Sequence, residues 1–207
     1  MAYNHEKGFS YVCEKQKICF IPIPKNASTT FRKELESNSI IYEVDNFIEN
    51  PEILQKNKVI CIAREPISRF VSGYLEILIR THDCPKTLEK EFYYVKQEPQ
   101  RFLEFIKEIK KEFYDAHVEP QLFYISDSKG DKIHVDEVWL MNNVNCGLEK
   151  AFGIKVVSRH NEKKDDIKKQ YIEFLEKNTR VKKIIEGLYE RDISFFNKLL
   201  EKKDKSE

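Results

Sequence analysis

Short apolar runs separated by polar residues dominate the first third of the chain. Tyr11–Glu14 and Ile18–Ile23 predict two strands, joined by the polar turn Lys15–Lys17. Lys58–Ala63 predicts a third strand. Because Ile18–Ile23 and Lys58–Ala63 are apolar at successive positions, we expect them to be buried on both faces, as strands of a parallel sheet are.

Each of these two buried strands leads into a predicted helix. The first helix is expected to run from Ser28 to about Glu36. The second begins near Pro66, which suits the first turn of a helix because the backbone N–H that proline lacks would be unpaired there. Its apolar residues recur at helical spacing: Phe70, Tyr74, Ile77 and Leu78.

The rest of the chain continues to alternate between the two kinds of element. An amphipathic helix is expected around Phe102–Ile109, a loop over Tyr114–Gln121, and strands over Leu122–Ser126 and Val135–Met141. Helices are predicted over Gly147–Phe152, Lys163–Lys177 and Val181–Lys202. This alternation predicts an α/β fold, with a mainly parallel central sheet flanked by helices. A single domain over residues 1–207 is expected, with a core over about residues 10–200 and a charged tail over 201–207.

The composition is consistent with one hydrophobic core and argues against some classes of binding partner. The 207 residues are 41% hydrophobic, which is enough for one well-packed domain. The 36 basic residues nearly balance the 35 acidic ones, so the net charge of +1 creates no overall field for nucleic acid, and no such partner is expected. No apolar stretch approaches the roughly 20 residues that cross a bilayer. Since Met1–Lys17 also has no signal-peptide core, we expect a cytoplasmic protein without a membrane span.

The cysteines do not form a recognisable framework. They are five, an odd number, and no two have the C-x-x-C spacing. Cys19 and Cys61 lie within apolar runs, where a thiol packs as a small hydrophobic group. We therefore expect reduced thiols, with no disulfide framework and no zinc site.

The junction between the second strand and the first helix has the composition of an anion site. Its sequence over Ile23–Thr30 is Ile-Pro-Lys-Asn-Ala-Ser-Thr-Thr. A helix N-terminus presents unpaired N–H groups and the positive end of the helix dipole. Lys25 adds a full positive charge, while Asn26 and Ala27 are small enough to let an anion approach the backbone. The hydroxyl donors are Ser28, Thr29 and Thr30.

This junction differs from a Walker A loop. In that motif the lysine directly precedes the Ser or Thr, and two glycines are required. Here Lys25 lies three residues before Ser28, and the segment contains no glycine. An ordinary strand–turn–helix junction with a Ser or Thr cap is the alternative interpretation.

A second junction follows Lys58–Ala63. Arg64 stands at the end of that strand, and Ser72 follows eight residues later within the predicted helix. The planar guanidinium suits a phosphate monoester, and a serine hydroxyl can add a donor. The alternative is that Arg64 pairs with a carboxylate and Ser72 is a small packing residue. Two such strand-end loops in order are more specific than either loop alone.

The segments IPKNASTTF and REPISRFVSGY together resemble the two motifs with which sulfotransferases bind PAPS (3′-phosphoadenosine 5′-phosphosulfate). They are most similar to sulfotransferase family 2, which includes carbohydrate sulfotransferases. The resemblance implies that the first segment holds the 5′-phosphosulfate through Lys25, Asn26, Ala27, Ser28, Thr29 and Thr30. It implies that Arg64 and Ser72 hold the 3′-phosphate.

Weaker similarities extend the resemblance over about Tyr11–Leu200. They are the hairpin YVCEKQKICF, the mid-chain HVEPQ and the late LYERDISFF. The resemblance implies a P-loop-like sulfotransferase fold and transfer of a sulfuryl group from PAPS to a hydroxyl. A carbohydrate is the expected acceptor, PAP (adenosine 3′,5′-bisphosphate) is the product, and no metal is required.

Sulfuryl transfer needs a cation near the leaving oxygen and a base for the acceptor hydroxyl. Lys25 is the candidate cation. His117, in the expected loop, is the first candidate base, because an imidazole titrates near neutral pH. Glu119 and Glu34 are the carboxylate alternatives, in which case His117 is a structural residue of the loop.

A basic stretch, Ser158–Lys164, precedes the long polar helix near the C-terminus. Related enzymes carry a basic late loop over the nucleotide, which makes Arg159, Lys163 or Lys164 candidate nucleotide ligands by resemblance. A solvated charge run explains the same residues equally well.

Two other function classes share the strand–loop–helix logic. One is a nucleotide-dependent kinase or other P-loop phosphotransferase, although the Walker lysine and a clear magnesium motif are missing. The other is a non-catalytic anion-binding protein on the same fold. The sequence does not indicate an oligomeric state.

Overall fold

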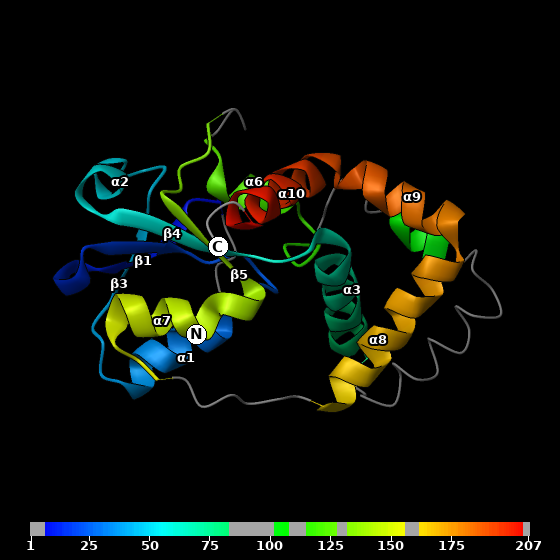
Figure 1. The fold of residues 1–207 in the computed structure, drawn as a ribbon, viewed down its shortest axis with the longest axis horizontal. Helices are drawn as coiled ribbons and strands as arrows, with labels where there is room; N and C mark the ends of the chain where they lie inside the picture. The colour runs from blue at the N-terminus through cyan, green and yellow to red at the C-terminus, as the bar shows by residue number, and fades with distance from the viewer. Residues whose placement is uncertain (1–6, 83–101, 108–114, 128–131, 156–161, 205–207) are drawn as a thin grey trace. The chain divides into compact units, whose positions relative to one another are not determined.

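The computed structural model of the chain describes residues 7–82, 102–107, 115–127, 132–155 and 162–204 (Figure 1). The chain divides into two compact units. Unit 1 comprises Met1–Arg64, Pro120–Ser158 and Leu199–Glu207, and unit 2 comprises Glu65–Glu119 and Arg159–Lys198. Each unit has a hydrophobic cluster of its own. The expectation of a single domain over residues 1–207 stays a prediction.

Unit 1 is built on a five-stranded sheet in the order β3-β1-β2-β4-β5. The strands are β1 (Phe9–Cys13), β2 (Ile18–Ile21), β3 (Glu43–Asn46), β4 (Lys58–Ala63) and β5 (Glu137–Leu140). β2 pairs with β4 and β4 with β5 in parallel, whereas β1 is antiparallel to both β2 and β3. The fold is therefore α/β, as predicted, but its sheet is mixed.

The antiparallel half of the sheet has a simple physical cause. Only the short 3-10 turn η1 (Glu14–Gln16) and Lys17, whose φ is 55°, separate β1 from β2. Such a short connection joins antiparallel neighbours, because parallel strands need a crossover of a dozen or more residues. β2 and β4 are connected by that longer route, through α1 (Ser28–Ser37), β3 and α2 (Glu52–Lys56).

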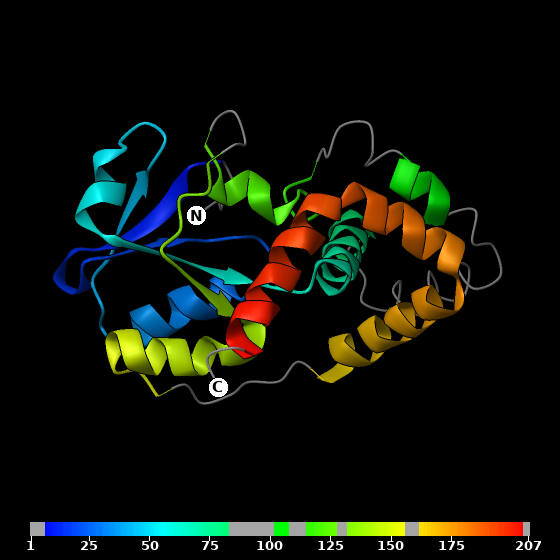
Figure 2. The same ribbon diagram turned by 45° about the horizontal axis from the view of Figure 1, so that its top comes forward.

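Helices α1 and α7 (Val144–Phe152) lie side by side on one face of the sheet (Figures 1 and 2). The fully buried ring of Phe31 in α1 stacks on Phe20 of β2, with ring centroids 3.7 Å apart. On α7, Gly147 permits a close approach, since a Cβ there would lie 2.4 Å from the indole of Trp139. The first contact holds α1 against β2, and the second holds α7 against β5.

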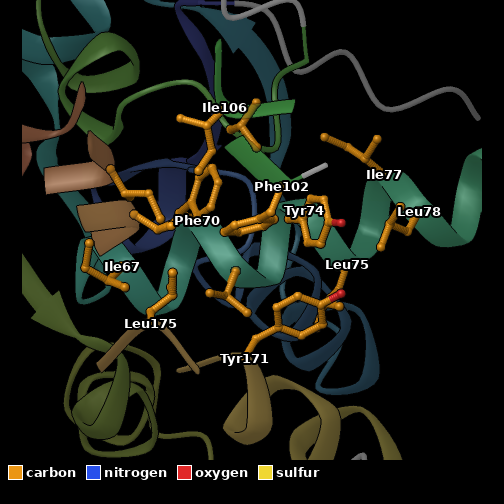
Figure 3. Close-up of a cluster of buried hydrophobic side chains, with 14 of the residues drawn as sticks. Ile67, Phe70, Tyr74, Leu75, Ile77, Leu78, Phe102, Ile106, Tyr171 and Leu175 are labelled. Carbon is orange, nitrogen blue, oxygen red and sulfur yellow. The ribbon is translucent and has the colours of Figure 1, made fainter. Parts of the chain in front are cut away.

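Unit 2 is helical. It contains α3 (Pro66–His82), a helical segment over residues 102–107, α8 (Glu162–Lys177), α9 (Thr179–Leu188) and α10 (Glu190–Asp204) as far as Lys198. Figure 3 shows the core of unit 2. The ring of Tyr74 packs edge to face against the rings of Phe102 and Tyr171, with distances between ring centroids of 4.9 Å and 5.5 Å. The helical spacing predicted for α3 is confirmed, because its four apolar positions are all buried.

Two sequence-based assignments were wrong. Leu122–Ser126 is not a strand, because α6 spans Gln121–Ile125 and buries Gln121, Tyr124 and Ile125 while Phe123 is exposed. A run of four apolar residues fits either element, so periodicity could not separate a strand from a helix here. The long helix predicted over Val181–Lys202 is two helices, α9 and α10, which meet at the buried Tyr189.

Other elements agree with the sequence or add to it. α1, β4 and α3 begin where they were predicted. The predicted helix over Gly147–Phe152 starts a turn earlier, after η2 (Met141–Asn143). β3 and α2 were not predicted. In β3, Val44 is the only β-branched residue, no residue is aromatic, and Asp45 and Asn46 are of types depleted in strands. Ile109 and Tyr114 lie outside the described residues.

The thiols of Cys19 and Cys61 are fully buried, as expected of small hydrophobic groups. Burial raises the pKa of Cys61 to about 12. Both cysteines are free, as are Cys13 and Cys146. Among the residues described, no helix combines the length and the apolar character needed to span a bilayer.

Candidate functional site

The first loop connects β2 to α1 with an unusual backbone. Lys25 and Ala27 have φ values of 67° and 58°, in the left-handed region, whereas Asn26 between them does not. Non-glycine residues adopt this conformation infrequently, and such strained positions cluster at functional sites. Backbone that alternates in hand at successive residues turns its N–H groups into a concave anion-binding surface.

The N-terminus of α1 is open at this loop. Its N-cap residue is Ala27, and no side chain caps the helix. The predicted Ser or Thr cap is therefore wrong, whereas an ordinary strand–turn–helix junction stays an alternative. The first-turn N–H groups of Ser28, Thr29 and Thr30 have no acceptor within the helix, and they carry the positive end of its dipole. The loop thus offers backbone donors, three hydroxyls and Lys25 to an anion.

The second loop contacts the first within unit 1. Arg64 directly follows β4, and its Nη1 donates a hydrogen bond of 2.8 Å to the carbonyl oxygen of Lys25. The structure therefore brings together Lys25 and Arg64, which the sequence assigned to two separate phosphate groups. Their side chains come from the carboxyl ends of the adjacent parallel strands β2 and β4.

A residue that the sequence analysis did not assign to the site joins the two loops. Gln121 of α6 is 1% exposed, and its Nε2 donates to the carbonyl oxygen of Arg64 at 2.8 Å. Its Oε1 accepts from the backbone N–H of Arg64 at 3.0 Å and from Nδ2 of Asn26 at 2.5 Å. Nδ2 of Asn26 also donates to the carbonyl oxygen of Ile62 at 2.7 Å. The signal in the sequence was the segment HVEPQ, in which Gln121 directly follows Pro120.

Asn26 keeps one unused acceptor. The residue is fully buried, and within the described part of the chain its Oδ1 accepts no hydrogen bond. Buried side-chain oxygens are normally paired with protein or with ordered water. This oxygen can therefore accept one N–H or O–H group from a water or a ligand.

Ser72, Glu119 and His117 belong to unit 2, whereas Lys25 and Arg64 belong to unit 1. Ser72 lies within α3 and is half-buried. The assignment of Arg64 and Ser72 to one 3′-phosphate stays a prediction. Glu34, the other carboxylate candidate, lies in α1 of unit 1.

His117 is paired with Asp115, which the sequence analysis had not singled out. Its Nδ1 lies 2.8 Å from Oδ1 of Asp115, and its backbone N–H donates to the same oxygen at 2.8 Å. The hydrogen bond from His117 lowers the pKa of Asp115 to about 2, so the carboxylate is ionised and can only accept. The two-residue spacing Asp-x-His was the available signal.

The tautomer of His117 decides its chemistry. An ionised Asp115 requires the proton on Nδ1, which leaves Nε2 able to take a proton, as in other histidines oriented by a carboxylate. Nη2 of Arg80 lies 2.5 Å from the same Nδ1, a contact that suits the opposite tautomer. We assign the proton to Nδ1, because Asp115 holds both the ring and the backbone of His117, whereas the Arg80 side chain is 48% exposed.

Glu119 lies in a different environment from Asp115. Burial raises the pKa of Glu119 to about 7, and the nearby Arg69 only partly opposes the shift. Arg69 itself is 1% exposed, and its Nη1 donates to the backbone carbonyl of Glu119 at 2.5 Å. A carboxyl group that titrates near neutral pH can serve as a base or an acid, so Glu119 stays an alternative to His117.

The loop that carries His117 packs closely on α3. An ideal Cβ on Gly73 would lie 2.2 Å from the carbonyl oxygen of His117. The next residue, Val118, is fully buried, and its carbonyl oxygen accepts a hydrogen bond from the hydroxyl of Tyr189. The position of His117 is thus set by its backbone as well as by Asp115.

The late basic stretch is only partly described. Arg159 lies outside the described residues, and Lys163 falls in α8 with a side chain that is also outside them, as is that of Lys164. Among the described residues, no three His, Cys, Asp or Glu side chains gather as a metal site would require. The expectation that the reaction needs no metal stays a prediction.

Comparisons of the chain with protein-family models, with curated proteins and with solved structures found no match. The resemblance to sulfotransferase family 2 therefore stays a prediction from the sequence segments. What the structure adds is the geometry of these loops, in particular the left-handed backbone at Lys25 and Ala27 and the bonds of Arg64 and Gln121.

Proposed function

We propose that the chain is a sulfotransferase that moves a sulfuryl group from PAPS to a hydroxyl group, with a carbohydrate as the acceptor class. The observation that carries the proposal is the contact between the two strand-end loops, in which Arg64 bonds to Lys25 and Gln121 bonds to both Arg64 and Asn26. A nucleotide with phosphate groups at two positions needs two such loops held in fixed relation. We propose that these loops form a P-loop-like site in which no Walker A sequence is required.

The donor set of the first loop fits a phosphosulfate. The left-handed Lys25 and Ala27 and the uncapped start of α1 offer backbone N–H groups, which bind anionic oxygens without a counter-charge of their own. Lys25 adds the charge that would stabilise the leaving phosphate oxygen as the bond to sulfur breaks. Arg64 supplies a planar fork for the 3′-phosphate.

In the proposed reaction, the bond between sulfur and the bridging phosphate oxygen breaks and a bond from sulfur to the acceptor oxygen forms. PAP leaves with the electron pair of the broken bond, and the acceptor loses its proton. Nε2 of His117 is the proposed proton acceptor, because Asp115 holds the proton of the ring on Nδ1. Asp115 is a positioning residue in this scheme.

Transfer of radiolabelled sulfate from PAPS to a mixture of glycans tests the reaction. Labelled product that depends on Lys25 and on Arg64 would support the proposal, with Arg180→Ala in α9 as a control for the loss of an exposed arginine. Calorimetry with PAP, with and without a chelator, tests the binding step. A strict requirement for a divalent metal, or thermal stabilisation by ATP with magnesium and none by PAP, would contradict the proposal and favour a kinase. Binding of PAP without any transfer would favour a non-catalytic anion-binding protein.

A further inference from the structure

Three hydrogen bonds of the Gln121 carboxamide end on residues of the anion loops. Oε1 accepts from Arg64 N–H at 3.0 Å and from Asn26 Nδ2 at 2.5 Å, and Nε2 donates to Arg64 O at 2.8 Å. Gln121 is separated from Arg64 by 57 positions and from Asn26 by 95. One side chain of α6 therefore ties together segments that follow two different strands.

Because the two amides are buried, the loss of any of their hydrogen bonds is costly. Gln121 is 1% exposed and Asn26 is fully buried, so neither amide can turn to bulk solvent for a lost partner. A buried polar group left without a partner costs about 1–3 kcal/mol, which is more than a paired one contributes. Hydrogen bonds in a chain of buried groups also strengthen one another. The loops are thus held in one geometry rather than in several of similar energy.

The backbone held by Gln121 is the backbone that would bind the anions. Both the N–H and the C=O of Arg64 are occupied by Gln121, which fixes the point where β4 ends and from which the guanidinium extends. That guanidinium in turn bonds to Lys25 O, beside the left-handed φ of 67° at Lys25. A strained conformation of this kind persists only where its surroundings enforce it.

We propose that Gln121 is a positioning residue that keeps both anion loops in their binding conformation, so that occupation of either loop depends on the same carboxamide. The choice of nucleotides as ligands rests on the proposed function. The claim that Gln121 holds the conformation of both loops does not rest on it. Gln121 acts through Asn26 and Arg64 and is not a catalytic residue.

Three nucleotides allow binding at each loop to be measured separately. Adenosine 5′-phosphate probes the first loop, adenosine 3′-phosphate probes the second, and PAP probes both. In calorimetry, Gln121→Met, which keeps the length but removes these three hydrogen bonds, should weaken the binding of both mononucleotides by about 5- to 10-fold, as expected for one net hydrogen bond each. Arg64→Ala should weaken adenosine 3′-phosphate more than adenosine 5′-phosphate. Leu148→Ala, in α7 and in the core of unit 1, serves as the control for lost stability alone.

Gln121→Glu provides a second variant with its own signature. The ionised carboxylate cannot donate to Arg64 O, whereas the protonated form has an O–H donor and a C=O acceptor, as the carboxamide does. Binding of PAP relative to wild type should therefore recover as the pH falls from 8 to 5, while Gln121→Met should show no recovery. A role in stability alone would produce neither the recovery nor a change in affinity of the folded protein.

Backbone amide hydrogen exchange keeps the inference testable without a nucleotide. Gln121→Met should increase exchange at residues 25–30 and at Arg64 together, beyond any increase in Leu148→Ala. If wild type binds none of the three nucleotides, the proposed function fails, and this measurement alone decides the inference. Unchanged exchange in either loop, or loss of only one mononucleotide, would overturn the positioning role of Gln121.

Discussion

The guanidinium of Arg64 donates a hydrogen bond of 2.8 Å to the carbonyl oxygen of Lys25. Arg64 therefore has two tasks in the proposed site: it carries the charge for a 3′-phosphate, and it supports the backbone of the first loop. An arginine can do both, because its fork has five N–H donors and keeps its charge at any accessible pH.

Arg64→Ala is expected to weaken PAP binding by about 2–4 kcal/mol, as for other truncated charge-assisted pairs. Adenosine 5′-phosphosulfate, which lacks the 3′-phosphate, should lose only about 1 kcal/mol, the typical net value of the hydrogen bond to Lys25. Calorimetry with both nucleotides measures the difference. Equal losses for the two would contradict the assignment of Arg64 to the 3′-phosphate.

Ala27→Gly should leave the free energy of unfolding unchanged or raise it slightly. Ala27 has a φ of 58°, a conformation that costs an L-residue about 1–2 kcal/mol and glycine almost nothing. Ala151→Gly, within α7, is the matched control and should lower stability by about 1 kcal/mol. Urea unfolding of the two variants measures the free energy of unfolding. A loss of stability in Ala27→Gly as large as that in Ala151→Gly would contradict the left-handed conformation of Ala27.

His117→Ala should lower turnover by roughly 10²–10⁴, the range for a lost general base, while PAP affinity stays the same. Asp115→Asn should also lower turnover strongly, because an asparagine can donate to Nδ1 and favour the wrong tautomer. Arg80→Ala should not lower it, because the contact of Arg80 with Nδ1 opposes the active tautomer. Steady-state kinetics of the three variants provide the test. Normal turnover in His117→Ala with loss in Glu119→Gln or Glu34→Gln would identify the base as a carboxylate.

Glu119 should make the stability of the fold depend on pH. The pKa of Glu119 is raised from its ordinary value of 4.5 to about 7 in the folded chain. As the pH rises, the unfolded chain therefore loses this proton before the folded chain does. The contribution of Glu119 to stability is therefore most favourable below pH 4.5, falls between 4.5 and 7, and is constant above. Glu119→Gln should remove this fall and make the protein more stable than wild type at pH 8. Urea titrations at pH 5 and 8 measure it, with Glu201→Gln in α10 as a control, and parallel curves for wild type and Glu119→Gln would contradict the shifted pKa.

Gly73→Ala and Gly187→Ala should have opposite effects, although both glycines lie in helices of unit 2. At Gly73 the new Cβ would meet the carbonyl oxygen of His117 at 2.2 Å, so α3 and the loop must separate, at a cost of about 1–3 kcal/mol. At Gly187 in α9 the new Cβ would meet no described atom within 4 Å apart from its chain neighbours and the adjacent backbone of its own helix. Alanine should therefore stabilise the helix by about 1 kcal/mol. Thermal unfolding distinguishes the two. A harmless Gly73→Ala would show that the loop does not pack against α3 as described.

The pattern of apolar and polar residues predicted those elements that depend mainly on their own residues. The boundaries of β4 and the starts of α1 and α3 followed from buried runs and from Pro66, because a strand or helix depends mainly on the residues within it. The same local reasoning located Lys25 and Arg64 at strand ends. It also failed locally at α6, where five residues carry too few turns to show a helical period.

Long-range hydrogen bonds were not predictable in the same way. Nothing near Gln121 in the sequence indicates that its partners are Asn26 and Arg64, because only the sheet brings the ends of β2 and β4 beside each other. The left-handed conformation at Lys25 and Ala27 was likewise hidden, since neither residue is a glycine or an asparagine. Asp115 was visible beside His117, but its role depends on a ring orientation that spacing does not specify.

Trp139, which packs over Gly147, is the only tryptophan of the chain and belongs to unit 1. Its indole is 6% exposed, and Nε1 donates to Glu137 at 3.0 Å. The intrinsic tryptophan fluorescence of the protein is therefore a natural probe of unit 1 alone, whereas far-ultraviolet circular dichroism follows the helices of both units. If the two signals change at the same urea concentration, the units unfold as one cooperative body, and separate midpoints would show that each melts independently.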